Sequence, residues 1–182
     1  MPEIVNVVGS GSLDAEFDLK RVAADIGSIA EYDPDKYPGM YLRFGEDDPL
    51  ITVYRTGKYI VTGADSETEA HKIRESFLRL LAENGIIPTP DDEWFRIQNL
   101  VCTAELDESL NLNALAIGLG LENTEYEPEQ FPGLIYRPPG ADSVVLLFAS
   151  GRVVITGSPN LDAAEQTFAA LQDEVTDLIA VD

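Results

Sequence analysis

Apolar and polar residues follow two patterns along the chain, and both patterns occur in each half of the sequence. Runs with an apolar residue at every second position, or with several in a row, predict short strands. These strands are expected near residues 3–8, 40–45, 50–55 and 58–63, and again near 96–103, 134–138, 143–149 and 152–157. The dipeptides Thr56-Gly57 and Ser150-Gly151 predict a hairpin turn before the last strand of each set.

Apolar residues spaced three and four positions apart predict one short and one long helix in each half. The short helices are expected near residues 19–26 and 112–119. The first long helix is expected to begin with a capping box at Ser66–Glu69 and to end at Asn84-Gly85. The second is expected to begin near Ser158-Pro159, because the first turn of a helix tolerates proline.

The two halves are copies of one unit of roughly ninety residues. Asn6-Val7-Val8 recurs as Asn99-Leu100-Val101, the nine residues 31–39 recur as 125–133, and Thr62-Gly63 recurs as Thr156-Gly157. We therefore predict two repeats, 1–90 and 91–182, joined by the Pro- and Asp-rich segment Pro88–Glu93. Each repeat has the order β-α-β-β-β-β-α, which predicts an antiparallel sheet with helices on one face and the other face open.

The composition adds a strong negative charge to this picture. The chain has 33 Asp and Glu against 12 Lys and Arg, a formal net charge of −21. The imbalance is larger in residues 91–182, with 17 acidic and 3 basic residues, than in 1–90, with 16 and 9. Such a protein repels itself in dilute salt, whereas molar salt shortens the screening length to about 3 Å. We expect a halophilic host; the alternative is an acidic protein that binds basic partners.

Several functional classes are disfavoured. No run approaches the roughly 18 apolar residues of a membrane span, and the N-terminus lacks the features of a secretory signal. The single cysteine, Cys102, cannot form an internal disulfide, and no Cys/His cluster could bind zinc. His71 is interpreted as a solvated helix residue and Cys102 as a small strand residue, so the sequence predicts a cytoplasmic protein that is not an enzyme and needs no metal or cofactor.

Residues 111–137 and 146–157 carry a specific resemblance. Both segments resemble the second repeat of archaeal TATA-box-binding proteins, and the similarity extends over essentially the whole chain. The resemblance implies an α+β saddle in which the two repeats, related by a pseudo-twofold axis, form one curved antiparallel sheet with helices on the convex face. It implies a nucleoid-associated general transcription initiation factor, from a haloarchaeal host, that binds and bends TATA-like promoter DNA.

By the same resemblance, small residues on the open face contact the minor groove of DNA. The implied contacts are made by the amides of Asn6 and Asn99, by Val8 and Val101, and by Thr62 and Thr156. The groove edge of A·T pairs offers only hydrogen-bond acceptors, which suits an amide donor. The alternative for Asn6 and Asn99 is a strand-end amide that caps a turn.

Aromatic wedges and cations complete the implied DNA site. In the family two aromatic residues per repeat unstack base steps, and the matching residues here are Tyr37, Tyr54, Phe131 and Phe148. The implied phosphate contacts are Arg43, Lys58, Arg137 and Arg152. The alternatives are core aromatics and solvated surface cations.

The resemblance also implies a protein partner, transcription factor B, and through it RNA polymerase. Its contact residues in the second repeat match Glu127, Glu129 and Gln130. Tyrosine replaces the wedge phenylalanines of the first repeat, and a buried phenol without a partner costs roughly 1–3 kcal/mol. A second hypothesis therefore remains open: a divergent paralogue that binds transcription factor B or regulators, with weak or no DNA binding.

Overall fold

Each repeat contains its elements in the order strand, helix, four strands, helix. The computed structural model describes residues 1–90 and 94–180. The first repeat contains β1 (Glu3–Ser12), α1 (Leu19–Ile26), β2 (Ala30–Glu31), β3 (Met40–Leu42), β4 (Leu50–Val53), β5 (Lys58–Ala64) and α2 (Glu67–Glu83). The second contains β6 (Arg96–Glu105), α3 (Leu112–Leu119), β7 (Thr124–Glu125), β8 (Leu134–Tyr136), β9 (Val144–Leu147), β10 (Arg152–Ser158) and α4 (Leu161–Ala180). The expected β-α-β-β-β-β-α order is confirmed, and β2 and β7 are the strands of that order for which no residue range was predicted.

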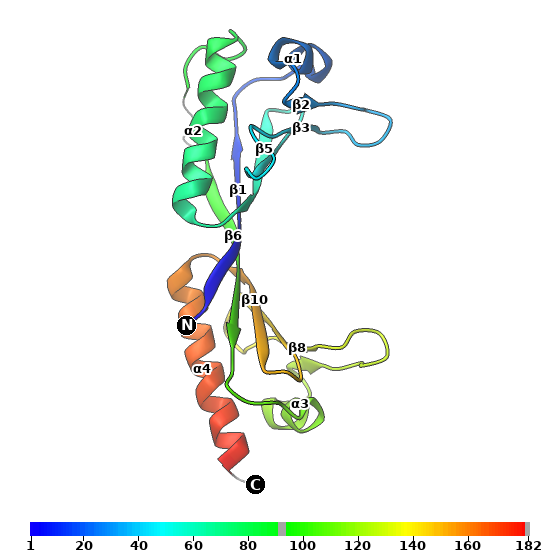
Figure 1. The fold of residues 1–182 in the computed structure, drawn as a ribbon, viewed down its shortest axis with the longest axis vertical. Helices are drawn as coiled ribbons and strands as arrows, with labels where there is room; N and C mark the ends of the chain where they lie inside the picture. The colour runs from blue at the N-terminus through cyan, green and yellow to red at the C-terminus, as the bar shows by residue number, and fades with distance from the viewer. Residues whose placement is uncertain (91–93, 181–182) are drawn as a thin grey trace. The chain divides into compact units, whose positions relative to one another are not determined.

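The ten strands form one sheet in the order β2-β3-β4-β5-β1-β6-β10-β9-β8-β7. The chain divides into two compact units. The first-copy unit is Asn6–Gln98, and the second-copy unit combines Met1–Val5 with the chain from Asn99 onward. In each unit one long helix lies beside the strands, and the loop after the two-residue strand projects on the other side (Figure 1). The last three residues of the predicted connecting segment, 91–93, lie outside the described residues.

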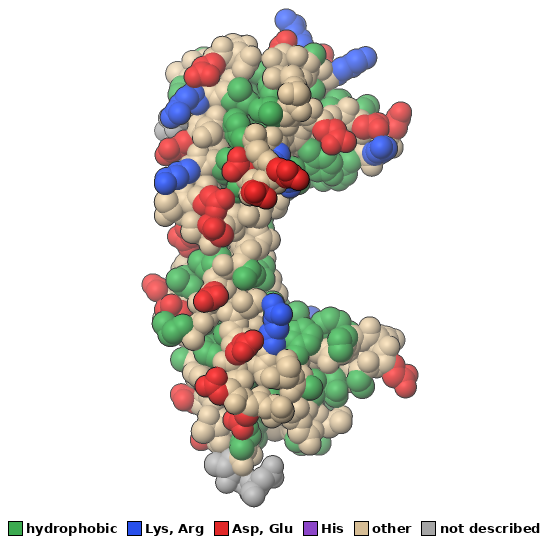
Figure 2. Space-filling view, in the orientation of Figure 1, with side chains coloured by type: hydrophobic (Ala, Val, Ile, Leu, Met, Phe, Trp, Pro, Cys, Tyr) green, Lys and Arg blue, Asp and Glu red, His purple; other side chains and the backbone are tan. Residues whose placement is uncertain are grey.

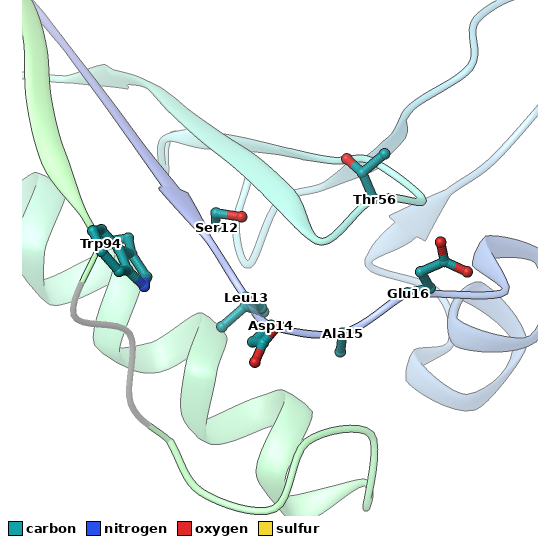
Figure 3. A pocket seen from close by; sticks show the side chains of 7 residues that line it. All are labelled: Ser12, Leu13, Asp14, Ala15, Glu16, Thr56 and Trp94. Atoms are coloured by element: carbon teal, nitrogen blue, oxygen red, sulfur yellow. The ribbon is translucent and has the colours of Figure 1, made fainter.

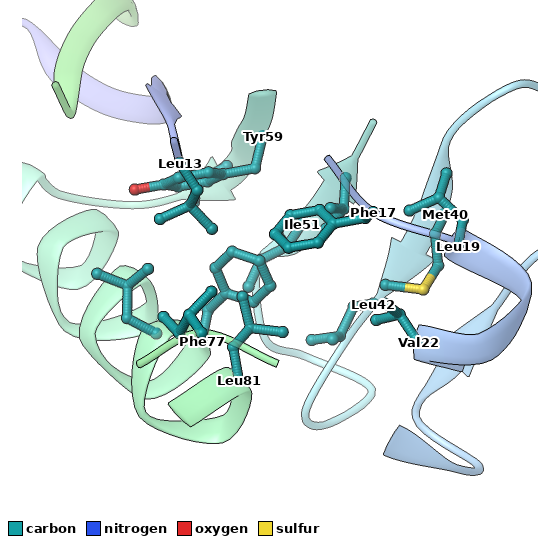
Figure 4. Close-up of a cluster of buried hydrophobic side chains, with 14 of the residues drawn as sticks. Leu13, Phe17, Leu19, Val22, Met40, Leu42, Ile51, Tyr59, Phe77 and Leu81 are labelled. Carbon is teal, nitrogen blue, oxygen red and sulfur yellow. The ribbon is translucent and has the colours of Figure 1, made fainter. Parts of the chain in front are cut away.

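The first-copy core forms where the sheet meets its helices. Apolar side chains from β3, β4, β5, α1 and α2 fill it, among them Met40, Ile51, Tyr59 and Phe77 (Figure 4). Phe95, which precedes β6, packs its ring parallel to that of Tyr59 at 6.1 Å between centroids. Apolar residues at helical spacing on α2 face this core, and Ala70, Phe77 and Leu81 are fully buried.

Several predicted boundaries of strands and helices were wrong. β1 and β6 run past the expected ends at residues 8 and 103, because the alternation of buried and half-buried positions continues. The outer strands β3 and β8 end earlier than expected. α4 begins at Leu161, and Pro159 lies outside it, because the Asn160 side chain caps the helix by accepting from the Ala163 amide at 2.8 Å.

Burial alternates along the central strands in the same way in both units. β1 and β6 share one pattern, in which Val7 and Leu100 are buried against the helices and their neighbours Val8 and Val101 are half-buried. Successive strand residues point to opposite faces, so each unit presents an uncovered sheet face. Among the described residues no helix is both long and apolar enough to cross a membrane.

Candidate nucleic-acid interface

Two asparagines stand at matching places on the uncovered faces, and each is held by a backbone amide. Asn6 Oδ1 accepts from the Gly63 amide at 2.7 Å. Asn99 Oδ1 accepts from the Gly157 amide at 2.6 Å, and its Nδ2 lies 3.3 Å from Thr156 Oγ1. A backbone N–H can only donate, so these contacts identify Oδ1 as the bound atom and Nδ2 as the remaining donor group. The turn-capping role of the asparagines is therefore present in the structure.

The Thr-Gly pairs create the backbone irregularity that the asparagines hold. Where β5 pairs with β1, β5 has one extra residue at Thr62-Gly63. Where β10 pairs with β6, β10 has one extra residue at Thr156-Gly157. Gly63 and Gly157 have φ angles of 89° and 83°, in the left-handed region that favours glycine. Each bulge turns its glycine amide toward the asparagine on the neighbouring strand.

In the second-copy unit two phenylalanines form an aromatic pair on a glycine. Phe131 and Phe148 meet edge to face with centroids 5.9 Å apart and planes at 71°. A Cβ placed on Gly133 would lie 2.8 Å from the Phe131 ring and 3.0 Å from the Phe148 ring. A side chain on residue 133 would therefore displace at least one ring of the pair. Phe131 is 38% exposed, which contradicts the alternative that it belongs to the core.

The first-copy unit builds the same arrangement from tyrosines. Tyr37 and Tyr54 lie 6.2 Å apart with planes at 62°, and their hydroxyls are 2.5 Å apart. This hydrogen bond is the main cause that raises the Tyr54 pKa to about 12. Tyr41 stacks on Tyr37 at 5.3 Å, and a Cβ on Gly39 would lie 2.9 Å from the Tyr37 ring. Each hydroxyl thus has a partner before any ligand binds.

The four predicted phosphate-contacting cations are all exposed. Arg43 follows β3, and Lys58 and Arg152 open β5 and β10 after the hairpin glycines. Arg137, after β8, donates to Glu125 Oε1 of β7 at 3.2 Å. One of the four cations is therefore already engaged by a carboxylate of its own unit.

The predicted partner-binding residues lie on the projecting loop of the second-copy unit. Glu127, Glu129 and Gln130 are exposed, and the Glu127 carbonyl accepts from the amides of Gln130 and Phe131 at 3.0 Å each. This turn also positions the Phe131 ring. Hydrophobic side chains gather beside the projecting loop of each unit, with acidic side chains around them (Figure 2).

Two hollows of the described surface differ in their relation to the predicted contact residues. A hollow of about 810 Å³ in the first-copy unit is lined by Ser12, Leu13, Asp14, Ala15, Glu16, Thr56 and Trp94 (Figure 3). That hollow contains no predicted contact residue, whereas a hollow of the second-copy unit contains Arg152 together with Glu3, Glu105 and Asp107. Among residues 1–90 and 94–180 no group of His, Cys, Asp and Glu is arranged to hold a metal ion.

Residues outside the predicted set shape the site. Gly39 and Gly133 were recognised only as members of the repeat, and their role under the aromatic pairs depends on contacts between loop and strand. Tyr41 was not predicted as part of the site. The repeat offered a signal, because Tyr41 corresponds to Ile135 and so adds a third hydroxyl to those of Tyr37 and Tyr54. Cys102 is fully buried, and burial raises its thiol pKa, as expected for a structural cysteine.

Comparison with known proteins identifies the family. The model of the family "Transcription factor TFIID (or TATA-binding protein, TBP)" matches residues 1–84 and 94–178. The chain belongs to the TATA-binding protein family. It is 51% identical to TATA-box-binding protein C of Halobacterium salinarum over 97% of this chain and 98% of that protein. It is 44% identical to the TATA-box-binding protein of Haloarcula marismortui over 99% and 96%, respectively.

A solved structure gives the same result for the fold. The structure of Methanococcus jannaschii TBP matches with a TM-score of 0.84 and 39% identity, over 97% of this chain and 98% of that one. The predicted α+β fold with two repeats in one ten-stranded antiparallel sheet is confirmed. The chain is a general transcription initiation factor of this family, which is not enzymatic, and its haloarchaeal relatives agree with the halophilic host expected from the charge.

Proposed function

We propose that this protein binds and bends TATA-like promoter DNA from the minor groove, with repeats 1–90 and 91–182 each contacting one part of the site. The observation that carries the proposal is the pair of aromatic rings resting on a glycine, present in both units. Side chains that wedge between base steps kink DNA toward the major groove, and the TATA-binding protein family is itself a standard example of this mode. The protein would act in the cytoplasm, on promoters of the nucleoid.

The uncovered faces have the chemistry that the minor groove of A·T-rich DNA requires. Val8 and Val101 provide small apolar contacts, and Thr62 and Thr156 lie on the adjacent strands. Asn6 and Asn99 present amide donors, and A·T pairs offer only acceptors on this edge. These groups read groove width and A·T content, with little capacity to distinguish A·T from T·A.

The phosphate contacts are fewer than the affinity of a typical DNA-binding protein requires. Arg43, Lys58 and Arg152 stand at strand ends, and Arg137 has to exchange Glu125 for a phosphate. Neutralised phosphates supply much of the affinity of DNA-binding proteins in ordinary salt. We therefore expect weak binding at about 0.1 M salt and specific binding in the molar potassium chloride of a halophilic cytoplasm.

A titration on labelled duplexes tests this proposal. The protein is titrated onto a TATA-containing duplex and a G·C-rich duplex of equal length, at about 0.1 M and about 2 M potassium chloride. Fluorophores at the two ends of each duplex report the bend. Selective binding with bending at high salt is the expected result, and equal affinity for both duplexes at both salts would contradict it.

We further propose that Glu127, Glu129 and Gln130 bind transcription factor B. The loop presents two exposed acidic side chains, those of Glu127 and Glu129, on a turn held by the Glu127 carbonyl. Such a surface suits a basic partner surface. The matching loop of the first copy carries Asp33, Asp35 and Lys36, and there Lys36 lies 3.8 Å from Asp33. The second-copy loop is therefore the more acidic of the two.

The two loops offer a matched comparison. Glu127→Gln with Glu129→Gln is expected to weaken transcription factor B binding about tenfold and to leave TATA affinity within about twofold. Asp33→Asn with Asp35→Asn removes the same charge from the other loop and is expected to leave factor binding unchanged. Factor binding without any DNA binding at either salt would favour the second hypothesis, a protein-interaction module.

A further inference from the structure

The aromatic pairs of the two copies differ in polarity while sharing their geometry. Tyr37, Tyr41 and Tyr54 of the first copy correspond in the repeat to Phe131, Ile135 and Phe148 of the second. Both pairs meet at steep angles, 62° and 71°, with centroids 6.2 and 5.9 Å apart. The chain therefore contains an internal comparison in which the ring positions are kept and the hydroxyls are added.

The hydroxyls of Tyr37 and Tyr54 leave a defined hydrogen-bonding capacity. Each hydroxyl has one donor hydrogen and two acceptor lone pairs. Their mutual hydrogen bond, 2.5 Å long, uses one donor and one lone pair. One O–H donor and three lone pairs remain at the tip of the pair. The Tyr54 hydroxyl, whose pKa this hydrogen bond raises to about 12, is protonated in neutral solution, as an ordinary tyrosine is.

This remaining capacity complements the one base-pair edge that an apolar wedge cannot satisfy. In the minor groove an A·T pair shows only acceptors, whereas a G·C pair adds the N2 amine of guanine as a donor. A wedge of phenylalanines that covers this amine leaves a buried donor without an acceptor, which is unfavourable. A tyrosine pair can accept from the amine and donate its remaining hydrogen to a neighbouring base acceptor.

We propose that the hydrogen-bonded pair Tyr37–Tyr54 is a specificity determinant that accepts a G·C pair at its end of the DNA site, whereas Phe131–Phe148 restricts the other end to A·T. The inference rests on the proposed binding and wedging of DNA. On this proposal the tyrosines give the first copy a specificity of its own and are not simply a weaker wedge than phenylalanines. A site with G·C at one end then also fixes the direction in which the protein binds.

Inosine isolates the group on which the proposal depends. An inosine·C pair keeps the Watson–Crick partner of G·C and lacks the N2 amine, so its minor-groove edge resembles that of A·T. The parent duplex is a palindromic A·T site, so that the protein can bind in either direction. Four further duplexes carry G·C at one end step, G·C at both end steps, or inosine·C in the same two arrangements.

The wild-type protein is expected to lose no more than about twofold in affinity with G·C at one end, because it can bind with the tyrosine pair there. With G·C at both ends it is expected to lose about tenfold, the effect of one buried donor without an acceptor. Both inosine·C duplexes are expected to bind within about twofold of the parent.

Removing the hydroxyls from the first-copy pair, or adding them to the second-copy pair, is expected to change how much affinity each G·C substitution costs. Tyr37→Phe with Tyr54→Phe is expected to lose about tenfold with G·C at one end and about a hundredfold with G·C at both. The converse variant, Phe131→Tyr with Phe148→Tyr, is expected to bind the doubly substituted duplex within about twofold of the parent. Affinity for the parent duplex, together with the thermal midpoint, reports whether each variant is folded.

The possible results separate this inference from the proposed function. If the wild-type protein does not bind the parent duplex, the proposed function fails and this inference fails with it. If the parent is bound but one G·C end already costs the wild type about tenfold, or if the tyrosine-to-phenylalanine variant shows the wild-type pattern, only the tyrosine pair's role is overturned. An equal loss with inosine·C would also overturn it, because the amine would then not be the group recognised.

Discussion

At the scale of single residues, the site depends on atoms whose hydrogen-bonding roles are fixed by the backbone. The amide of Asn99 is anchored through Oδ1 by the Gly157 N–H at 2.6 Å. Rotation of the amide by 180° would place Nδ2 against that N–H, donor against donor. The side chain is thereby prepared to present a donor without a conformational search, which lowers the entropic cost of binding.

Asn99→Asp tests the donor without removing the anchor. A carboxylate still accepts from the Gly157 amide, so we expect the thermal midpoint to shift by less than about 2 °C. The donor is lost and a negative charge faces the groove, so TATA affinity should fall at least about tenfold, since one base contact contributes about 1–3 kcal/mol. Fluorescence anisotropy with a labelled duplex measures this.

The control for this change is available within the repeat. Asn111→Asp makes the same substitution at an exposed helix cap whose first-copy counterpart is Asp18. We expect wild-type affinity and stability for that variant. A loss of affinity as large as that of Asn99→Asp would mean that charge alone, and not the amide donor, causes the effect.

Not all of these residue-scale features could be predicted from the sequence. The repeat and the resemblance identified Asn6, Asn99 and the four wedge aromatics by type and position. The partner of the Tyr37 hydroxyl could not be predicted, because Tyr54 is 17 residues away and meets it only when the projecting loop returns over β4. Hydroxyl pairing depends on distances of a few tenths of an ångström, which no periodicity encodes.

At the scale of secondary-structure elements, the segment that starts the second repeat also completes the first-copy core. Phe95 is 6% exposed and packs against Tyr59 and against the edge of His71. A Cβ on Gly9 of β1 would lie 2.4 Å from the Phe95 ring. In the repeat, Gly9 and Phe95 correspond to Cys102 and Pro2, so the glycine and the large ring that meet in the first copy have no equivalent in the second.

Gly9→Ala is expected to destabilise the protein by about 1–3 kcal/mol, because the added methyl group overlaps the Phe95 ring in a packed core. Guanidinium unfolding at constant high potassium chloride measures the free energy of unfolding. Phe95→Leu on its own should also destabilise the protein. If Gly9→Ala costs as much in the Phe95→Leu background as in the wild type, the overlap with the ring is not the cause.

The extent of the elements was less predictable than their order. The sequence placed α4 at Ser158-Pro159 because proline fits a first turn, whereas Asn160 competes more effectively as the cap. Of the central strands, β1 was predicted too short because Gly9 and Gly11 interrupt its apolar alternation. Those glycines occupy buried positions, so the pattern of burial continues where the pattern of hydrophobicity does not.

The ion pair between β7 and β8 leads to a prediction about DNA affinity. Glu125→Gln leaves Arg137 without its carboxylate, so the guanidinium becomes available to a phosphate. The pair is more than half exposed on both sides, so its own strength is small. We expect TATA affinity to rise about two- to fivefold at about 0.3 M salt and the gain to fade as salt increases.

Glu122→Gln provides the comparison for this variant. It removes an exposed carboxylate from the turn before β7, and the described part of the chain shows no ion pair there. An equal gain in affinity for Glu122→Gln would show that the loss of one negative charge, and not the release of Arg137, causes the effect. Mobility-shift titrations at several salt concentrations distinguish these outcomes.

At the scale of the whole molecule, charge controls how salt affects binding. Typical DNA-binding proteins release counterions from DNA and lose affinity steeply as salt rises. This chain carries a net charge of −21, so its carboxylates approach the phosphates on binding and must be screened or neutralised by cations. Cation uptake by the protein then offsets counterion release from the DNA. We expect TATA affinity to stay constant or to increase between about 0.5 and 2 M potassium chloride.

The acidic residues around Arg152 allow this balance to be altered at a known place. Arg152 shares its hollow with Glu105 and Asp107, so Glu105→Gln with Asp107→Asn should strengthen binding at low salt. The same change should turn the flat salt dependence into a loss of affinity with increasing salt, because fewer cations are taken up.

Asp173→Asn with Asp177→Asn removes equal charge from exposed positions of α4 and should change the salt dependence much less. If both double variants change it equally, only total charge matters; if neither does, the carboxylates near Arg152 do not take up cations when DNA binds.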